Sequence, residues 1–295
     1  MSPRHIAAAL LTVLLWGLNH VVAKVGVEAS APFWFVGVRL VLVGILVAPF
    51  VTLPRGRWPG IALLSFVYGA LHLGLINFGL AGIDAATSVI IVQLGAPFTI
   101  LLGRFVFKET FGRWRWAGIA LAFLGIGLLA GEPRIDAPIY FIASVAAMAV
   151  WGVANVIIKR LDDVSPLTIS AWSSLLAAPQ ILLASALLES GQMNVFTAPT
   201  ADFWLMALYS AVASSIIAHT LWNGLLHRYP MATVAPFNLL VPLVGFAAAI
   251  IFLGEPVTDE KIYGGVLTFA GVALIQVRMI VKRFMSKDAA RAPTV

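Results

Sequence analysis

Residues 16–24 read WGLNHVVAK, and the pattern returns as WGVANVIIK at residues 151–159. Four positions are identical at an offset of 135 residues: Trp16/Trp151, Gly17/Gly152, Val21/Val156 and Lys24/Lys159. Both stretches lie inside long apolar segments, where polar side chains are costly unless they point into a helix bundle. The repetition indicates that the chain contains the same structural unit twice.

The composition predicts a membrane protein. Of 295 residues, 61% are hydrophobic and 11% are charged, and the mean hydropathy is +0.97. A soluble domain carries about 25% charged residues. The chain has no cysteine, which excludes disulfides and cysteine metal sites. Its net charge of +6 is scattered between apolar runs, so no nucleic-acid partner is expected.

Ten apolar segments have the length needed to cross a hydrocarbon core of about 30 Å, which is about 20 residues of helix. Backbone groups must be paired in lipid, so we expect helices throughout and an all-α fold. Pro32 and the length of the first segment favour a retained helix over a cleaved signal peptide. The predicted spans are 6–26, 33–53, 60–82, 85–105, 115–131, 138–158, 167–188, 203–225, 231–253 and 262–281.

The distribution of Lys and Arg predicts the orientation. With a cytoplasmic N-terminus, 15 of the 19 basic residues fall on the inner side. The positive-inside rule therefore places both termini in the cytoplasm, with residues 282–295 as a basic cytoplasmic tail.

The internal similarity extends well beyond the opening stretch. TSVIIVQLGAP (87–97) corresponds to ATVAPFNLLVP (232–242) at an offset of 145. Each half contains five predicted helices, and because five is odd the second half enters the membrane from the opposite side. Inverted repeats of this kind are typical of secondary transporters. The fifth and tenth segments share the glycine pairs Gly118/Gly264 and Gly125/Gly271.

Four stretches resemble the EamA-type family of the drug/metabolite transporter superfamily: 16–27, 94–109, 227–258 and 263–275. The resemblance covers nearly the whole chain. It implies a first EamA-like repeat at 1–133 and a second, inverted one at 134–281. It also implies a permease of the bacterial inner (cytoplasmic) membrane, often an exporter of amino acids or related metabolites, with a central cavity lined by both halves. The substrate, direction, ion coupling and oligomeric state stay open.

The repeated stretches supply the first candidate site residues. Trp16, Asn19 and His20 share one helix face through i, i+3 and i+4 spacing, and Trp151 and Asn155 share the equivalent face. These two faces either line a central cavity for substrate or hold neighbouring helices together as packing contacts.

A second candidate pair lies where prolines interrupt the fourth and ninth segments. Pro97 and Pro242 should kink their helices, because proline cannot donate to the carbonyl four residues earlier. Those carbonyls belong to Gln93 and Asn238, which also carry amide side chains. The groups suit a polar or zwitterionic solute, or the amides satisfy the freed carbonyls locally.

The third and eighth segments add further polar positions. Tyr68 and His72 are four residues apart, and Ser215, His219 and Trp222 share one face. The histidines have no counterpart in the other half, so they either select the substrate or serve as hydrogen-bonded packing residues.

Charge inside the predicted spans is sparse. No carboxylate lies near the middle of a segment, so coupled protons, if any are used, must be carried by histidine. Arg39 either attracts a substrate carboxylate or extends its side chain to the outer interface, where its charge meets water. The second explanation is the simpler one. Lys24 and Lys159 lie near opposite faces as anchors or gate residues.

Two further features concern the ends and the edges of the bundle. Glu109 and Glu255 follow the fourth and ninth segments and suggest helix capping or a hinge. The fifth and tenth segments are rich in small residues, which fits close packing outside the pathway or a contact between two copies.

No enzyme motif is present: the sequence lacks a P-loop, HExxH and GxSxG. We therefore expect no enzyme activity, no cofactor and no metal, with the lipid bilayer and a small-molecule substrate as partners. The leading hypothesis is alternating-access export of a small amino acid or similar metabolite. The alternatives are a facilitator, a permease for drugs and toxic compounds, and an intramembrane enzyme or assembly factor.

Overall fold

The computed structural model describes residues 1–108, 112–133, 135–197 and 201–289, and these residues form helices and connecting loops without a strand. Eight helical stretches are long and apolar enough to cross a membrane. They coincide with eight of the ten predicted segments, so the multi-pass membrane prediction is confirmed. The eight are Pro3–Ala29, Pro32–Phe50, Trp58–Ala81, Ala85–Phe107, Pro138–Lys159, Pro166–Leu188, Asp202–Arg228 and Pro236–Leu253.

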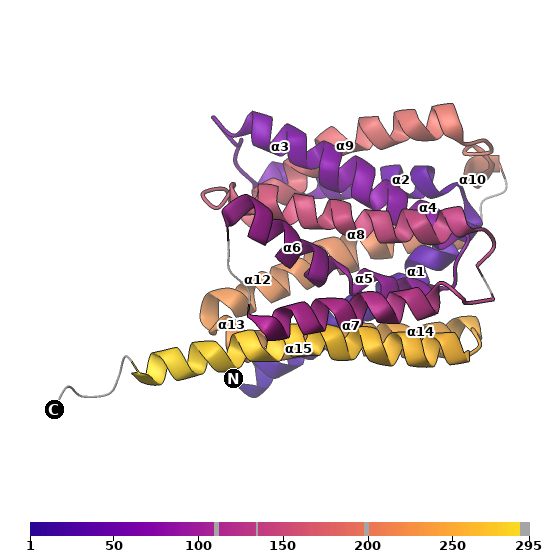
Figure 1. Ribbon diagram of the computed structural model, residues 1–295. Helices are drawn as coiled ribbons and strands as arrows, with labels where there is room; N and C mark the ends of the chain where they lie inside the picture. The colour runs from indigo at the N-terminus through magenta and orange to yellow at the C-terminus, as the bar shows by residue number, and fades with distance from the viewer. Residues whose placement is uncertain (109–111, 134, 198–200, 290–295) are drawn as a thin grey trace.

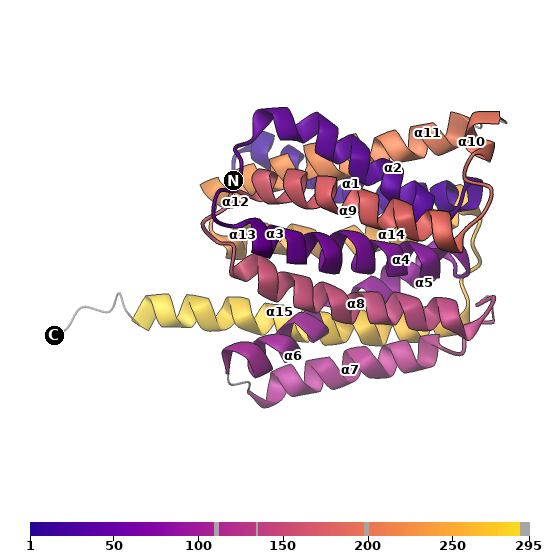
Figure 2. The ribbon, with the colours of Figure 1, turned by 90° about the horizontal axis from the view of Figure 1, so that it is seen from above.

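The helices lie side by side as one bundle (Figures 1 and 2). In chain order they are α1 (Pro3–Ala29), α2 (Pro32–Val47), η1 (Ala48–Phe50), α3 (Trp58–Leu64), η2 (Ser65–His72), α4 (Leu73–Ala81), α5 (Ala85–Val92), α6 (Gly95–Phe107), α7 (Arg113–Leu129), α8 (Pro138–Lys159), α9 (Pro166–Leu188), α10 (Asn194–Thr197), α11 (Ala201–Leu208), η3 (Tyr209–Ala218), α12 (His219–Arg228), α13 (Met231–Asn238), α14 (Val241–Leu253) and α15 (Asp259–Ala289).

The last helix is longer than predicted. α15 continues to Ala289, eight residues past the expected end at 281. Residues 282–289 of the predicted tail are therefore helical, and 290–295 lie outside the described residues.

The apolar core joins helices from both halves of the sequence. Ile90 of α5, Leu129 of α7 and Met148 of α8 are buried in one cluster. Phe35 of α2 and Phe203 of α11 pack edge to face in another, with ring centroids 6.1 Å apart. Because lipid tails are as apolar as these side chains, close packing holds such helices together in a bilayer.

One end of the bundle brings four predicted inner segments together in two pairs. Arg57, after α2, donates to Asp163, after α8, over 2.8 Å. His5 in α1 contacts the hydroxyl of Tyr229, after α12, over 2.7 Å. The N-terminus and the end of α15 also lie at this end (Figure 1).

The opposite end is held by buried charges. The Glu255 carboxylate accepts hydrogen bonds from the N–H groups of Ala85 and Ala86, over 2.7 and 2.8 Å. Burial raises the pKa of the Glu255 carboxyl, whereas these two N–H groups favour its ionised form. Lys261, 1% exposed, contacts Asp84 over 2.5 Å. Glu255, for which the sequence suggests capping or a hinge, thus caps the start of α5.

A second carboxylate caps α2 in the same way. Glu189, at the end of α9, accepts from the N–H groups of Phe33 and Trp34 over 2.7 and 3.1 Å. These N–H groups have no partner inside their own helix, so the cap supplies one. Glu109, for which the sequence also suggests capping, lies outside the described residues.

α7 and α15 lie against each other at glycines (Figure 1). A Cβ atom added at Gly125 would lie 2.5 Å from the carbonyl oxygen of Gly264, and one at Gly118 would lie 2.7 Å from that of Gly271. The small residues of the fifth and tenth segments therefore serve close packing within the chain.

This packing predicts the effect of adding one methyl group. We expect Gly125→Ala to lower the free energy of unfolding by about 1–3 kcal/mol, because the methyl meets backbone atoms that must move. Gly127→Ala is the matched control on α7, since a Cβ there meets nothing within 4 Å. Thermal unfolding in detergent measures both. Equal melting temperatures for the two variants would contradict the packing.

Candidate functional site

Two helices depart from α-helical geometry near their middles. η2 (Ser65–His72) and η3 (Tyr209–Ala218) are π-helical. They occupy matching places, because Ser65 and Ser210 are separated by 145 residues, the offset found between the later parts of the two halves. π-Helical turns are rare and occur often at functional sites.

Trp16 of α1 packs against η3 and α12. Its indole Nε1 donates to the carbonyl oxygen of Ser214 over 3.2 Å. Its ring centroid lies 5.0 Å from that of His219 and 5.4 Å from that of Trp222. The Nδ1 atom of His219 lies 3.0 Å from the same Ser214 oxygen. The structure thus brings together three predicted site residues, which we call the Trp16 cluster (Trp16, His219 and Trp222).

Trp151 of α8 forms a corresponding group with η2. Its ring centroid lies 5.3 Å from Tyr68 and 5.2 Å from His72, and the Tyr68 and His72 rings are stacked. The Nδ1 atom of His72 lies 2.9 Å from the carbonyl oxygen of Ala147. These residues form the Trp151 cluster (Tyr68, His72 and Trp151).

The amides next to the tryptophans also make contacts between helices. Asn19 Oδ1 accepts from Ser210 Oγ over 3.0 Å, and Asn155 Nδ2 donates to Thr99 Oγ1 over 3.1 Å. His20 lies against Gly245 of α14, where an added Cβ would meet its ring at 3.2 Å.

Arg39 reaches into the bundle. Its Nη2 and Nε atoms lie 2.9 and 3.3 Å from the Ser215 hydroxyl oxygen. Ser215 is near the middle of the Asp202–Arg228 span, whereas Arg39 starts about 10 Å from the beginning of α2. The guanidinium therefore does not snorkel outward, because Ser215 fixes it at greater depth.

The proline positions coincide with interruptions in the helices. α5 ends at Val92 and α6 begins at Gly95, two residues before Pro97. α13 ends at Asn238 and α14 begins at Val241, next to Pro242. The Gln93 carbonyl accepts from the N–H of Ala96 over 3.4 Å, so a local contact partly replaces the hydrogen bond that proline removes.

Gln93 and Asn238 carry the amide side chains at the two helix breaks. Gln93 Nε2 lies 3.5 Å from the Val89 oxygen of its own helix, a long contact. Asn238 is exposed.

The two lysines lie at the helix ends. Lys24 contacts the Leu80 carbonyl over 3.1 Å and Glu28 over 3.2 Å. Lys159 lies over the ring of Phe107, 4.0 Å from its centroid. Within the described ranges, no three His, Asp or Glu side chains are grouped as a metal site would require.

Comparison with known families decides what kind of chain this is. The model of the EamA-like transporter family matches twice, over residues 4–131 and 138–277. The chain belongs to the EamA-like transporter family.

Related proteins carry names that agree with this family. Probable amino-acid metabolite efflux pumps of Salmonella typhimurium (strain LT2) and Escherichia coli (strain K12) are 36% and 33% identical to this EamA-like chain, each covering 92% of it and 94% of the relative. A probable terminal-alkyne amino-acid exporter of Streptantibioticus cattleyicolor is 27% identical over 94% of both chains. A solved crystal structure shares the fold, with a TM-score of 0.62, 18% identity, and coverage of 94% and 98%.

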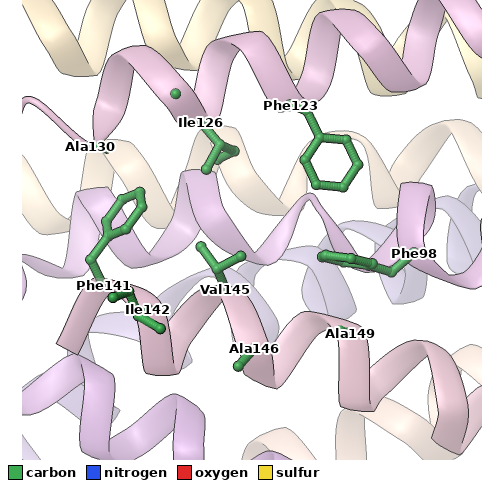
Figure 3. A pocket seen from close by; sticks show the side chains of 10 residues that line it. Phe98, Phe123, Ile126, Ala130, Phe141, Ile142, Val145, Ala146 and Ala149 are labelled. Carbon is green, nitrogen blue, oxygen red and sulfur yellow. The ribbon is translucent and has the colours of Figure 1, made fainter. Parts of the chain in front are cut away.

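A separate apolar groove opens between α6, α7 and α8 of this EamA-like protein, with a volume of about 420 Å³ (Figure 3). Phe98, Phe123, Phe141 and Val145 line it, and Figure 3 shows no nitrogen or oxygen on the side chains drawn. The groove therefore cannot orient a polar solute by hydrogen bonds, and the polar clusters remain the candidate site.

Sequence reasoning missed several members of the site. Ser210 and Thr99 were not singled out, and neither was the Ser214 carbonyl oxygen, which accepts from Trp16. Ser210 and Ser214 are four residues apart on a polar stretch, a spacing that could have indicated a shared face. The π-helical segments left no signal in the apolar periodicity.

The histidine contacts predict a single tautomer for each ring. A carbonyl oxygen can only accept, so Nδ1 must carry hydrogen in both His72 and His219. Nitrogen-15 NMR of histidine-labelled protein should show this hydrogen on both rings, with the exposed His227 as the control. A hydrogen-free Nδ1 in either ring would overturn these contacts.

Proposed function

We propose that the protein is an inner-membrane secondary transporter that exports amino acids or related metabolites by alternating access. In this proposal the ten helical segments form two inverted five-helix repeats, residues 1–133 and 134–281, with both termini in the cytoplasm. The names of the three relatives support the substrate class, and the double family match supports the duplication.

Antiparallel packing between equivalent helices supports the inversion. Gly118 meets Gly271, and Gly125 meets Gly264, so residue numbers rise along α7 as they fall along α15. The sequence repeat pairs Gly118 with Gly264 and Gly125 with Gly271. Exchanging the two halves therefore turns the Gly118–Gly271 contact into the Gly264–Gly125 contact. A two-fold axis perpendicular to the helices produces this pattern, and such an axis lies in the membrane plane.

Reciprocal contacts between the halves support the same axis. Gly17 of α1 packs against Val244 of α14, and Gly152 of α8 packs against Phe98 of α6. Phe98 and Val244 lie 146 residues apart, the offset of the glycine pairs above. Each half therefore places its first helix on the fourth helix of the other.

One observation carries the transport mechanism. Trp16 of the first half contacts η3 of the second, and Trp151 of the second half contacts η2 of the first. If the halves rock against each other, these reciprocal contacts change in opposite senses and expose the space between them to alternate sides. A π-helical segment supports such motion because its hydrogen-bond register is already displaced.

The proposed substrate-contacting residues come from both halves. They are Trp16, Asn19, His20, Tyr68, His72, Gln93, Trp151, Asn155, Ser215, His219, Trp222 and Asn238, with Pro97 and Pro242 setting the helix breaks. Lys24 and Lys159, at opposite ends, are proposed as anchors. A facilitator would share this site but would show no uphill flux, and a drug permease would accept apolar compounds in place of amino acids.

The topology predicts which loops face outward. The chain has no native cysteine, so single cysteines report on one position each. Met193 and Leu53 are 63% and 51% exposed, in loops at opposite ends. A membrane-impermeant maleimide should label Met193→Cys in intact cells, and Leu53→Cys after permeabilisation alone. The reverse pattern would contradict a cytoplasmic N-terminus.

Reconstituted flux tests the substrate class. We expect proteoliposomes to show saturable flux of at least one neutral amino acid from a panel covering all charge classes. Varying the pH gradient in the same assay shows whether protons are coupled. Absence of saturable flux for every amino acid would reject the proposed function.

Amide removal tests the residues at the helix breaks. We expect Gln93→Leu combined with Asn238→Leu to reduce flux about tenfold, the effect of losing about 1.4 kcal/mol of solute binding. Asn77→Leu is the matched control, because this buried amide hydrogen-bonds to Leu73 of its own helix. Normal flux in the double variant would remove both amides from the site.

A further inference from the structure

Arg39 is a guanidinium inside the bundle that lacks a carboxylate partner among the described residues. Ion pairs among these residues include Lys24 with Glu28, Arg57 with Asp163, and Lys261 with Asp84 and Glu132. Arginine keeps its charge in proteins. Charges within membrane spans pair with other groups or face a water-filled cavity, so Arg39 is a candidate contact for an anionic ligand.

The hydrogen bonds of Arg39 leave room for that ligand. Nε and Nη2 share one neutral acceptor, the Ser215 hydroxyl oxygen. The Ser215 hydroxyl donates its hydrogen to the Ser210 carbonyl over 2.7 Å, which orients its oxygen for Arg39. A guanidinium has five N–H donors and pairs best with the two oxygens of a carboxylate.

The side chains around Arg39 indicate the chemistry of the ligand beyond its carboxylate. Ser215, which Arg39 contacts, follows Ser214, whose carbonyl oxygen accepts from Trp16 and lies 3.0 Å from His219 Nδ1, so the guanidinium lies beside the Trp16 cluster. Aromatic faces attract an ammonium group and accept apolar side chains. In the described part of the chain, the lysines with known contacts lie at the ends of the bundle, away from this region.

We propose that Arg39 binds the α-carboxylate of the exported amino acid as a bidentate pair, and that the site selects monocarboxylic amino acids with uncharged side chains. This inference rests on the proposed function and names the substrate class for the same region. Among the described residues, a second carboxylate meets no further cation in contact with Arg39 or Ser215, and a side-chain ammonium meets no carboxylate there. Ser215 is a positioning residue that holds the guanidinium before substrate arrives.

Carboxylate removal on the ligand tests this pairing. Competition against L-leucine flux in proteoliposomes compares L-leucine, leucinamide and L-glutamate as probes. Wild-type protein should prefer L-leucine to leucinamide and to L-glutamate by tenfold or more. If leucinamide competes as well as L-leucine, the proposed pairing is wrong, whatever any variant does.

Removing the charge of Arg39 tests the same pairing from the side of the protein. Arg39→Gln should weaken L-leucine binding by tenfold or more and bring the leucine-to-leucinamide preference close to one, while Arg39→Lys should keep part of it. Arg57→Gln is the control, because this exposed arginine pairs with Asp163 at the end of the bundle. A preference retained in Arg39→Gln overturns the inference but leaves amino-acid export standing. Wild-type protein without flux of any amino acid rejects the export function itself.

Discussion

The requirement that backbone polar groups be paired inside a bilayer governs this structure. Regular helices meet it internally, but η2 and η3 leave the α-helical register. Side chains then satisfy the irregular backbone: Trp16 and His219 both approach the Ser214 oxygen. Two members of the Trp16 cluster, Trp16 and His219, are therefore the side chains that approach this irregular backbone. Stability and the candidate site depend on the same contacts, so the proposed movement of one half would exchange these partners.

The sequence was sufficient for features set by local composition and by repetition. Apolar length defined the spans, and the chain breaks near Pro97 and Pro242 follow from proline chemistry. The small residues of the fifth and tenth segments indicated close packing. The structure shows that these two segments pack against each other. These features depend on properties of single helices, and a sequence records such properties directly.

Features that depend on depth and partner were not accessible from sequence. Arg39 can extend outward or inward from the same helix position, and the presence of Ser215 on η3 decides between them. Glu255 follows α14 in the chain but caps α5, because the loop returns across that end of the bundle. The π-helical segments add no apolar periodicity of their own. Each of these outcomes is fixed by a neighbour that is distant in sequence.

The two matching halves of the sequence are chemically unequal at the proposed site, and this inequality would give the proposed site a direction. At the repeat offset of 135, Arg39 corresponds to Ser174 and His20 to Asn155, and at the later offset His219 corresponds to Gly74. If the two halves rock as proposed, the charge stays on the first half. In the proposed site, a solute with one carboxylate then has a single favourable orientation, since the positions away from Arg39 offer aromatic rings and amides. Reversing the solute would place its carboxylate against those rings, whose faces repel negative charge.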